Sequence, residues 1–229
     1  MNWFTIIYEN ENFLVVNKKS GISMHPAGRF EDFNLVLEIQ KDLGYKAYPV
    51  MRLDRETSGI CIFGKTSEAA AHLSYLIREK KIQKKYQCVV FGVPNPKEQI
   101  IENEIGERIC DYGKGWKKCI DGKKAQHAIT HIKVLKSNSE YSLVEVETKT
   151  GRQHQIRVHL SSIGHPIVGD KIYKEDWVFD KCVNELDYVM TKEMIDVVKS
   201  DRLLLHASYV KFEDFEFNCE IPKEFEKFI

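Results

Sequence analysis

Residues 51–63 read Met-Arg-Leu-Asp-Arg-Glu-Thr-Ser-Gly-Ile-Cys-Ile-Phe, so a charged loop runs directly into an apolar strand. Loops that lead into core strands often carry functional groups. Asp54 lies between Arg52 and Arg55 in the sequence, and a neighbouring cation favours the ionised form of a carboxyl group. An ionised aspartate in this loop can act as a nucleophile or as a base. A surface turn whose charges pair with one another would account for the same residues, so this segment leaves both interpretations open.

Strand patterns dominate the sequence around this segment. Runs of β-branched and aromatic residues, or of alternating apolar and polar residues, predict strands at 4–8, 13–17, 59–63, 85–91, 129–135, 141–148, 206–212 and 215–219. Helical spacing and capping residues predict helices at 35–43, from Thr66 to about Lys80, and at 153–163. Because strands outnumber helices without regular β-α-β alternation, we expect an α+β fold with a largely antiparallel mixed β-sheet core flanked by helices and loops.

The composition is that of an ordinary globular protein. The chain has 229 residues, 43% of them hydrophobic and 30% charged, which excludes disorder, collagen and coiled coil. No segment approaches the roughly 18 apolar residues of a membrane-spanning helix, and the first residues lack a secretion signal. We therefore expect a cytoplasmic protein that forms a single domain over residues 1–229. The structure of 175–201 is left open, although Leu186, Val189, Met190 and Met194 would form an apolar stripe on a helix.

The six cysteines are spread along the chain without a C-x-x-C pair, at positions 61, 88, 110, 119, 182 and 219. This spacing excludes a zinc ribbon and a thioredoxin-type redox motif. A chain of this length without a secretion signal needs no disulfide bonds. We expect each cysteine to be a reduced, buried thiol.

Basic and acidic residues are equal in number, 34 of each, but they are unevenly distributed. Residues 1–174 contain 27 basic and 20 acidic side chains, whereas 175–229 contain 7 and 14. This division predicts a basic face backed by an acidic one. Dense basic runs suit a phosphate backbone, although solvated surfaces would explain them too. The candidate phosphate contacts are Lys80, Lys81, Lys84 and Lys85, with Lys117 and Lys118 as weaker ones.

A second unusual segment lies at 150–160, where two arginines, two histidines and two glutamines open a predicted helix. An amphipathic surface helix does not need this mixture. Helix N-termini and arginine side chains both bind phosphate or carboxylate groups, so the segment is a candidate anion site. His154 and His159 are five residues apart and lack the i, i+4 spacing that places two metal ligands on one helical face. We therefore expect no metal site here.

Together, these segments resemble the RluA-type pseudouridine synthases in order and spacing. The resemblance covers residues 13 to about 212 and rests on five ordered blocks. They are Leu14-Val15-Val16-Asn17-Lys18 with Gly21 and His25-Pro26; Arg52-Leu53-Asp54-Arg55-Glu56-Thr57-Ser58-Gly59 with Lys65; Lys85-Tyr86; Thr150-Gly151-Arg152 and His154-Gln155-Ile156-Arg157-Val158-His159-Leu160 with Gly164-His165-Pro166-Ile167 and Gly169-Asp170; and Leu205-His206-Ala207.

The resemblance implies an RNA-modifying isomerase. It would break the N-glycosidic bond of uridine, turn the uracil and rejoin C5 to C1′, without cofactor or metal, in ribosomal or transfer RNA. The match makes Asp54 the catalytic aspartate and Tyr86 a tyrosine that packs on the base and takes part in proton removal. It pairs Arg157 with the catalytic carboxylate and lets Arg52 fill the gap left by the extracted nucleotide.

The remaining predicted RNA contacts are Arg152, His154 and Gln155, together with the lysines of 80–85. Two positions depart from the family pattern, which usually has His at position 51 and Thr or Ser at position 153, where this chain has Met51 and Gln153. We expect both to lie on the RNA side. The S4-like domain of many relatives is not expected here, so the core would bind RNA by itself, as a monomer.

Two alternatives remain. One is an RNA-binding protein on the same scaffold that has lost catalysis, against which the presence of Asp54, Tyr86 and Arg157 argues. The other is a metal-dependent nuclease or phosphoesterase, for which the clustered carboxylates that hold Mg²⁺ are not found.

Overall fold

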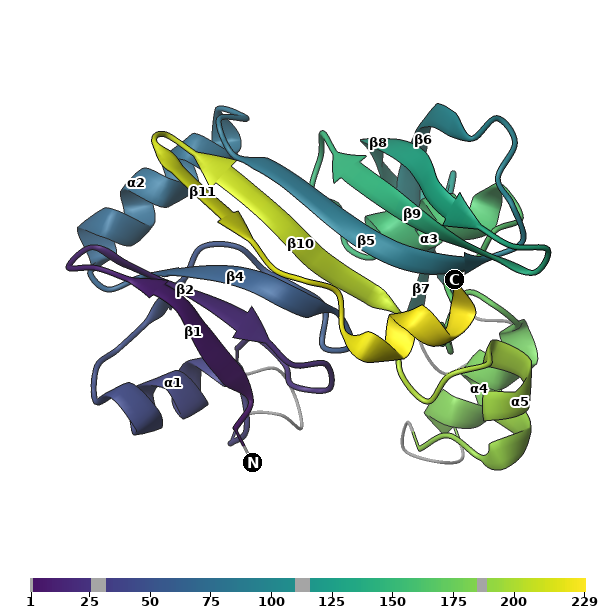
Figure 1. Ribbon diagram of the computed structural model, residues 1–229, viewed down its shortest axis with the longest axis horizontal. Helices are drawn as coiled ribbons and strands as arrows, with labels where there is room; N and C mark the ends of the chain where they lie inside the picture. The colour runs from purple at the N-terminus through teal and green to yellow at the C-terminus, as the bar shows by residue number, and fades with distance from the viewer. Residues whose placement is uncertain (1, 26–31, 110–115, 185–188) are drawn as a thin grey trace. The chain divides into compact units, whose positions relative to one another are not determined.

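The computed structural model describes residues 2–25, 32–109, 116–184 and 189–229, and they fold into two compact units. Unit 1 comprises Met1–Tyr86 and His206–Ile221, and unit 2 comprises Gln87–Leu205 and Pro222–Ile229. Each unit combines antiparallel strand pairs with helices (Figure 1). The predicted α+β class with a largely antiparallel sheet is confirmed.

Unit 1 is built from strands and from helices that precede and follow Asp54 in the sequence. Its strands are β1 (Phe4–Glu9), β2 (Phe13–Lys18), β3 (Tyr48–Pro49), β4 (Ser58–Gly64) and β11 (Phe215–Asn218), with most of β10 (Leu205–Phe212) and the first residues of β5 (Gln83–Phe91); its helices are α1 (Leu35–Leu43) and α2 (Ser67–Arg78). β2 pairs with β1 and β4 in antiparallel fashion, whereas β4 and β10 are parallel.

Local sequence explains where these helices begin and end. Asn34 caps α1 by accepting a hydrogen bond from the Leu37 amide, and Gly44 ends the helix in the left-handed conformation. Thr66 caps α2 by accepting from the Ala69 amide at 3.1 Å. The predicted ends of both helices agree with the structure to within about two residues.

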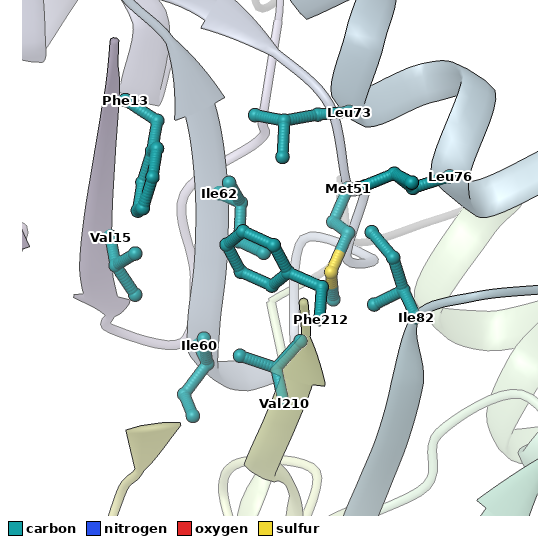
Figure 2. Close-up of a cluster of buried hydrophobic side chains, with 10 residues drawn as sticks. All are labelled: Phe13, Val15, Met51, Ile60, Ile62, Leu73, Leu76, Ile82, Val210 and Phe212. Atoms are coloured by element: carbon teal, nitrogen blue, oxygen red, sulfur yellow. The ribbon is translucent and has the colours of Figure 1, made fainter. Parts of the chain in front are cut away.

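A hydrophobic cluster fixes α2 against the strands of unit 1 (Figure 2). It combines Phe13, Val15, Ile60, Ile62, Val210 and Phe212 from the strands with Leu73 and Leu76 from α2 and with Ile82 and Met51. Met51 is only 4% exposed. The expectation that Met51 lines the RNA side is therefore wrong: its unbranched thioether fills the apolar core directly before the charged loop.

Gly59 allows β4 and β10 to approach closely. Its φ is +108°, and a Cβ at this position would lie 2.3 Å from the carbonyl oxygen of Ala207. Only glycine fits such a contact. The neighbouring residues Ser58 and His206 pair across the same two strands.

The described residues of unit 2 form a second antiparallel set of strands, three α-helices and a 3-10 helix. Its elements are the second part of β5, β6 (Glu98–Ile109), β7 (Trp116–Ile120), β8 (Lys123–Ser137), β9 (Tyr141–Thr148), α3 (Gln155–Ser162), α4 (Asp176–Asn184), α5 (Lys192–Val198) and the 3-10 helix η2 (Lys223–Phe228). β8 pairs with β6 and β9 in antiparallel fashion, and β6 also pairs with β7.

Several of these elements were not predicted. β6 and β7 were not predicted from the sequence, because glutamates and lysines obscure the alternation of their apolar residues. The open stretch 175–201 contains two short helices, in which Val178, Cys182, Met194 and Val198 form a small core of their own. Of the predicted stripe, Met194 is buried, Met190 is partly buried and Val189 is 66% exposed, while Leu186 lies outside the described residues.

Five of the six cysteines are described, and all five are free thiols. Cys61, Cys88 and Cys182 are buried as expected, and burial raises the pKa of Cys61 to about 12. Cys119, on β7, and Cys219, directly after β11, are partly exposed, so the expectation of a buried thiol is wrong for these two. Cys110 lies outside the described residues.

Candidate active site

A buried lysine holds the loop that carries Asp54. Lys18, at the end of β2, has no exposed surface, and its ammonium group donates hydrogen bonds to three carbonyl oxygens. They belong to Lys19 at 2.9 Å, Ile22 at 3.0 Å and Arg55 at 3.0 Å. Since Arg55 directly follows Asp54, the fully buried charge fixes the backbone next to the candidate catalytic residue.

Further hydrogen bonds hold the same loop. The Ser20 hydroxyl donates to the Glu56 carbonyl at 2.6 Å, and the Thr57 amide donates to the Asp54 carbonyl at 3.1 Å. Arg55 and Glu56 form an ion pair at 2.7 Å. Along the loop, Asp54 is half-buried and Arg52 is exposed. The loop is therefore anchored through its backbone, while the Arg52 side chain faces solvent.

Asp54 and Tyr86 interact electrostatically within unit 1. Tyr86 is 9% exposed. Burial, followed by the negative charge of Asp54, raises the pKa of Tyr86 well above its ordinary value. At neutral pH, Tyr86 thus keeps its phenolic proton, so it provides a neutral ring and a hydroxyl group beside the aspartate.

A buried polar pair lies at the end of the Asp54 loop. The Ser58 hydroxyl and His206 Nδ1 are 2.8 Å apart, and the two residues are 3% and 1% exposed. Ser58 opens β4 directly after the loop, so this hydrogen bond links the loop to β10. The two residues belong to blocks that were singled out in the sequence, but their contact was not predicted.

The lysines of 80–85 do not share one environment. Lys80 and Lys81 are exposed, whereas Lys84 and Lys85 are half-buried. Successive side chains of a strand point to opposite faces, so on β5 Lys84 shares the face of Tyr86 and Lys85 has the other face. Burial lowers the pKa of Lys84, and the Lys85 ammonium lies 5.9 Å from the centre of the Tyr209 ring.

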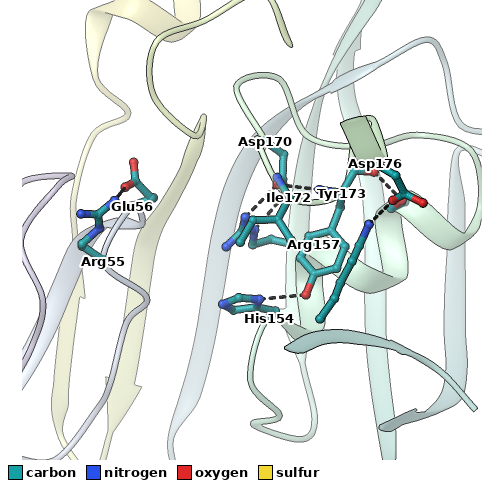
Figure 3. Close-up of polar contacts among 10 residues, drawn as sticks. Arg55, Glu56, His154, Arg157, Asp170, Ile172, Tyr173 and Asp176 are labelled. Carbon is teal, nitrogen blue, oxygen red and sulfur yellow. Dashed lines mark hydrogen bonds and ion pairs between the residues drawn. The ribbon is translucent and has the colours of Figure 1, made fainter. Parts of the chain in front are cut away.

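In unit 2, Arg157 forms a buried, bidentate ion pair with Asp170 (Figure 3). Arg157 Nε donates to Asp170 Oδ2 at 2.8 Å, and Nη2 donates to Oδ1 at 2.7 Å. The side chains are 3% and 0% exposed. Although burial by itself would raise it, the Arg157 charge and the hydrogen bonds hold the pKa of Asp170 below its ordinary value. The predicted partner of Arg157, Asp54, belongs to unit 1, and that pairing stays a prediction.

Gln155 organises the turn before α3. Its side-chain oxygen accepts from the Thr150 hydroxyl and the Arg152 amide, and its Nε2 donates to the Ile129 carbonyl and the Thr130 hydroxyl. Gln155 is only 4% exposed. Its amide group is thus engaged within the protein, whereas Arg152 is exposed and donates from Nε to the His127 carbonyl at 3.0 Å.

Thr130 also contacts a buried histidine. His159 Nδ1 lies 2.9 Å from the Thr130 hydroxyl oxygen, and the residue has no exposed surface. Burial lowers the pKa of His159 to about 4. His159 is therefore neutral at physiological pH, and its contact with Thr130 links α3 to β8.

Tyr173 connects the predicted site residues of unit 2. Its hydroxyl lies 2.8 Å from His154 Nδ1, and its ring centre lies 5.1 Å from the Arg157 guanidinium carbon. His154 adopts the left-handed conformation at the start of α3, with φ +57°. Its side chain is half-buried, whereas Gln153 is exposed, and its place on the RNA side stays a prediction. The sequence analysis missed the contribution of Tyr173.

The weaker lysine candidates are paired with acidic side chains. Lys117 on β7 forms an ion pair with Asp176 at 2.5 Å, and Lys118 forms one with Glu107 at 2.5 Å. Lys114 of the same run lies outside the described residues. Asp176 belongs to the acidic part of the chain, so at this point acidic and basic segments are in contact. The predicted separation into a basic and an acidic face is wrong here, because the hairpin of β6 and β7 folds against α4.

Within the described ranges, no three His, Cys, Asp or Glu side chains gather in the manner of a metal site. None of the helices that the structure describes is long and apolar enough to cross a membrane. The structure describes all residues of the first motif block except Pro26.

Comparisons with known proteins identify the family of this chain. A family model described as RNA pseudouridylate synthase matches residues 12–162. The mitochondrial tRNA pseudouridine(32) synthase of Saccharomyces cerevisiae is 32% identical over 200 residues, which cover 82% of this chain and 42% of the yeast protein. The dual-specificity RNA pseudouridine synthase RluA of Salmonella typhimurium is 36% identical over 176 residues, which cover 75% of this chain and 77% of that protein.

A solved structure supports the same relationship. The human RNA pseudouridylate synthase domain containing 1 superimposes with a TM-score of 0.72 at 25% identity, over 96% of this chain and 83% of the human one. The chain thus spans most of this structure but less than half of the yeast relative. These matches confirm the resemblance on which the site residues were predicted, and the chain belongs to the RNA pseudouridylate synthase family.

Proposed function

We propose that this chain is an RNA pseudouridine synthase that isomerises uridines in ribosomal or transfer RNA. The proposal is carried by the position of Asp54, whose charge acts on the buried Tyr86 and whose loop is held by the hydrogen bond from the buried Lys18 to the Arg55 carbonyl. Membership of the family supports the reaction type. The names of relatives support the RNA classes, since one is a tRNA pseudouridine(32) synthase and another a ribosomal large subunit pseudouridine synthase.

The reaction is an isomerisation in which atoms and charges balance. The bond between N1 and C1′ of the uridine breaks, C5 bonds to C1′, the C5 proton leaves, and N1 takes up a proton. We assign the central role to the Asp54 carboxylate as nucleophile or base. The neutral Tyr86 ring is suited to packing on the flat uracil, and its hydroxyl can exchange a proton during the transfer.

Arg157 is assigned to the catalytic carboxylate of Asp54, as the family pattern implies. Asp170 supports this role, because its bidentate ion pair fixes the orientation of the guanidinium group. The pairing requires that units 1 and 2 work as one catalytic domain, which is the proposal for residues 1–229. We also propose that the enzyme acts as a monomer in the cytoplasm.

RNA contacts are assigned to exposed or half-buried cations and to the start of α3. Arg52 is proposed to replace the extracted nucleotide in the stack, and its exposed side chain supports this role. Arg152 and His154 would contact RNA directly, and Lys80, Lys81, Lys84 and Lys85 would contact phosphates. Gln155 contributes by holding the turn that carries Arg152, since its amide group is already engaged within the protein.

The test is the conversion of uridine in unmodified transcripts of ribosomal and transfer RNA by the purified protein. We expect pseudouridine to form with the wild type and with Glu56→Gln, a matched change in the same loop. Asp54→Asn should abolish turnover while leaving the fold and most of the RNA affinity intact.

Comparing pseudouridine maps of cellular RNA with and without the gene identifies the target. Turnover by Asp54→Asn near the wild-type rate would refute the assignment, and RNA binding without any turnover by the wild type would favour an inactive RNA-binding protein.

We propose that the reaction needs neither cofactor nor metal, because the isomerisation has no redox step and its proton transfers can be carried by side chains. Dialysis of the purified enzyme against EDTA should leave the rate unchanged. Loss of activity that one particular metal restores would instead favour a metal-dependent enzyme.

A further inference from the structure

The Asp176 carboxylate forms ion pairs of the kind that a phosphate group would make. Asp176 Oδ1 lies 2.5 Å from Lys117 Nζ, and Oδ2 lies 3.8 Å from Arg108 Nη2. Arg108 and Lys117 are direct partners across the antiparallel β6–β7 pair, so their side chains lie on the same face. Two cations on adjacent strands thus hold the two oxygens of one anion.

The lysine of this pair is held in place by aromatic rings. The Lys117 ammonium lies 5.3 Å from the ring centre of Tyr173 and 5.8 Å from that of Phe179, and its side chain is only 13% exposed. An ammonium group over aromatic faces is attracted by their electrons. Its position is therefore defined before any ligand arrives, unlike that of an ordinary surface lysine.

The carboxylate, in contrast, is accessible. The Asp176 side chain is 62% exposed, so another anion can approach the two cations, and the displaced carboxylate can be solvated at low cost. The hydrogen bond from Lys117, together with the charges of Lys117 and Arg108, lowers the pKa of Asp176. The group therefore remains an anion throughout the neutral range.

The location of these cations connects them to the candidate active site. The Tyr173 ring contacts Lys117, and the same ring contacts the Arg157 guanidinium at 5.1 Å and His154 at 2.8 Å through its hydroxyl. The predicted site residues of α3 and the two cations of the hairpin are thus arranged around one aromatic side chain. An RNA strand bound to α3 would bring phosphates close to this hairpin.

We propose that Arg108 and Lys117 form a phosphate-binding site for RNA, and that Asp176 occupies this site in the free protein as a built-in competitor. Binding of RNA exchanges the carboxylate for a phosphate. This site rests on the proposed action on RNA. It adds to it a phosphate contact and a carboxylate that competes for the same cations. Asp176 would lower the affinity for every RNA. Tight binding would then require an RNA that also contacts the other proposed RNA-binding residues.

The test is the affinity for an unmodified tRNA transcript, measured at several salt concentrations. Asp176→Asn should raise the affinity about three- to tenfold at low salt and steepen the dependence of log affinity on log salt by up to about one unit. Glu193→Gln is the matched control. It removes one exposed carboxylate from the same acidic segment, but Glu193 pairs with Lys181 at 3.5 Å and not with the hairpin. Its effect should stay below about twofold.

A double-mutant cycle separates the local contact from a general charge effect. In the Lys117→Gln background, Asp176→Asn should no longer raise the affinity. If Asp176→Asn behaves like Glu193→Gln, or raises the affinity equally with and without Lys117, the proposed site is refuted. Asp176→Ser, which keeps a residue suited to a helix start, repeats the test if the Asn variant unfolds early in a thermal scan.

The same preparations are assayed for pseudouridine formation, which keeps the two proposals apart. If the wild type converts uridine and the cycle shows no coupling, only the Arg108–Lys117 site fails. If the cycle shows coupling but no uridine is converted, the phosphate site stands and the proposed activity fails.

Discussion

The Lys18 ammonium donates a 3.0 Å hydrogen bond to the carbonyl oxygen of Arg55, the residue that follows Asp54. The lysine is fully buried at the end of β2, and the two residues are far apart in the sequence. This buried cation supports the candidate catalytic loop through a hydrogen bond to its backbone.

Replacing Lys18 with methionine should therefore destabilise the protein. Methionine fits the space but leaves the carbonyl groups of Ile22 and Arg55 without this donor, at a cost of about 2 to 4 kcal/mol in the free energy of unfolding. Urea denaturation measures the effect. Lys19→Met is the control, since the Lys19 side chain is exposed and its loss should change stability by less than about 0.5 kcal/mol. Equal stability of the two variants would contradict a supporting role for Lys18.

Replacing Asp170 with asparagine should leave Arg157 as a buried charge without its bidentate partner. Breaking a buried ion pair on one side costs about 3 to 5 kcal/mol of stability. If Asp170 orients Arg157 for catalysis, kcat should fall more than KM rises at a temperature where the variant is folded. Asp176→Asn serves as a control for the removal of a carboxylate from an exposed ion pair, and it should leave stability almost unchanged. A variant with the wild-type kcat would show that the ion pair has only a structural role.

His159 should make stability depend on pH below neutrality. Burial lowers its pKa to about 4 in the folded protein, so between about pH 6.5 and 4 the unfolded chain binds a proton that the folded chain does not. Stability contributed by the neutral side chain is thus complete above pH 6.5 and declines as the pH falls, by about 3 kcal/mol in total. In the protonated ring both nitrogens carry hydrogen, and Nε2 has no hydrogen-bond partner among the residues that the structure describes.

Comparison with His159→Gln isolates this contribution from that of the carboxyl groups. The difference in unfolding free energy between wild type and variant, measured by urea denaturation from pH 7.5 to 4.5, should shrink as the solution becomes more acidic. A difference that does not change with pH would mean that His159 titrates alike in both states.

Lys84 and Lys85 should contribute unequally to RNA binding. Lys84 shares the strand face of Tyr86, whereas Lys85 has the opposite face. Lys84→Gln should therefore lower RNA affinity more than Lys85→Gln and reduce the salt slope by about 0.7 to 0.9, the amount of one phosphate contact. Binding isotherms at several salt concentrations provide the measurement. A larger effect of Lys85→Gln would place the RNA on the other face of β5.

The sequence was informative wherever the structure depends on neighbours along the chain. Apolar spacing and capping residues located α1 and α2, because the side chains that cap and line a helix are within a few residues of one another. The sequence blocks around Asp54 and Tyr86 identified two residues of which one, Asp54, acts through its charge on the pKa of the other. Residues whose proposed role depends on their own side-chain chemistry, such as Asp54 and Tyr86, could thus be recognised before the fold was known.

The sequence could not reveal contacts that depend on which segments meet. β6 carries glutamates along one face and pairs with β8 and β7, so its place in the sheet is defined by its partners rather than by its own pattern. Met51 was expected beside RNA and lies in the core instead, because the direction of its side chain follows from the packing of α2 against β4.

Charge pairing was decided by the tertiary structure in the same way. The equal numbers of acidic and basic residues say nothing about which of them meet, since electrostatic interactions act over distances in space and not along the sequence. The ion pairs of Arg157 with Asp170 and of Lys117 with Asp176, and the hydrogen bond from the buried Lys18 to the Arg55 carbonyl, join segments that only folding brings together. The sequence by itself determined the chemical groups of the site, and the tertiary structure decided which of them are buried, oriented or neutralised.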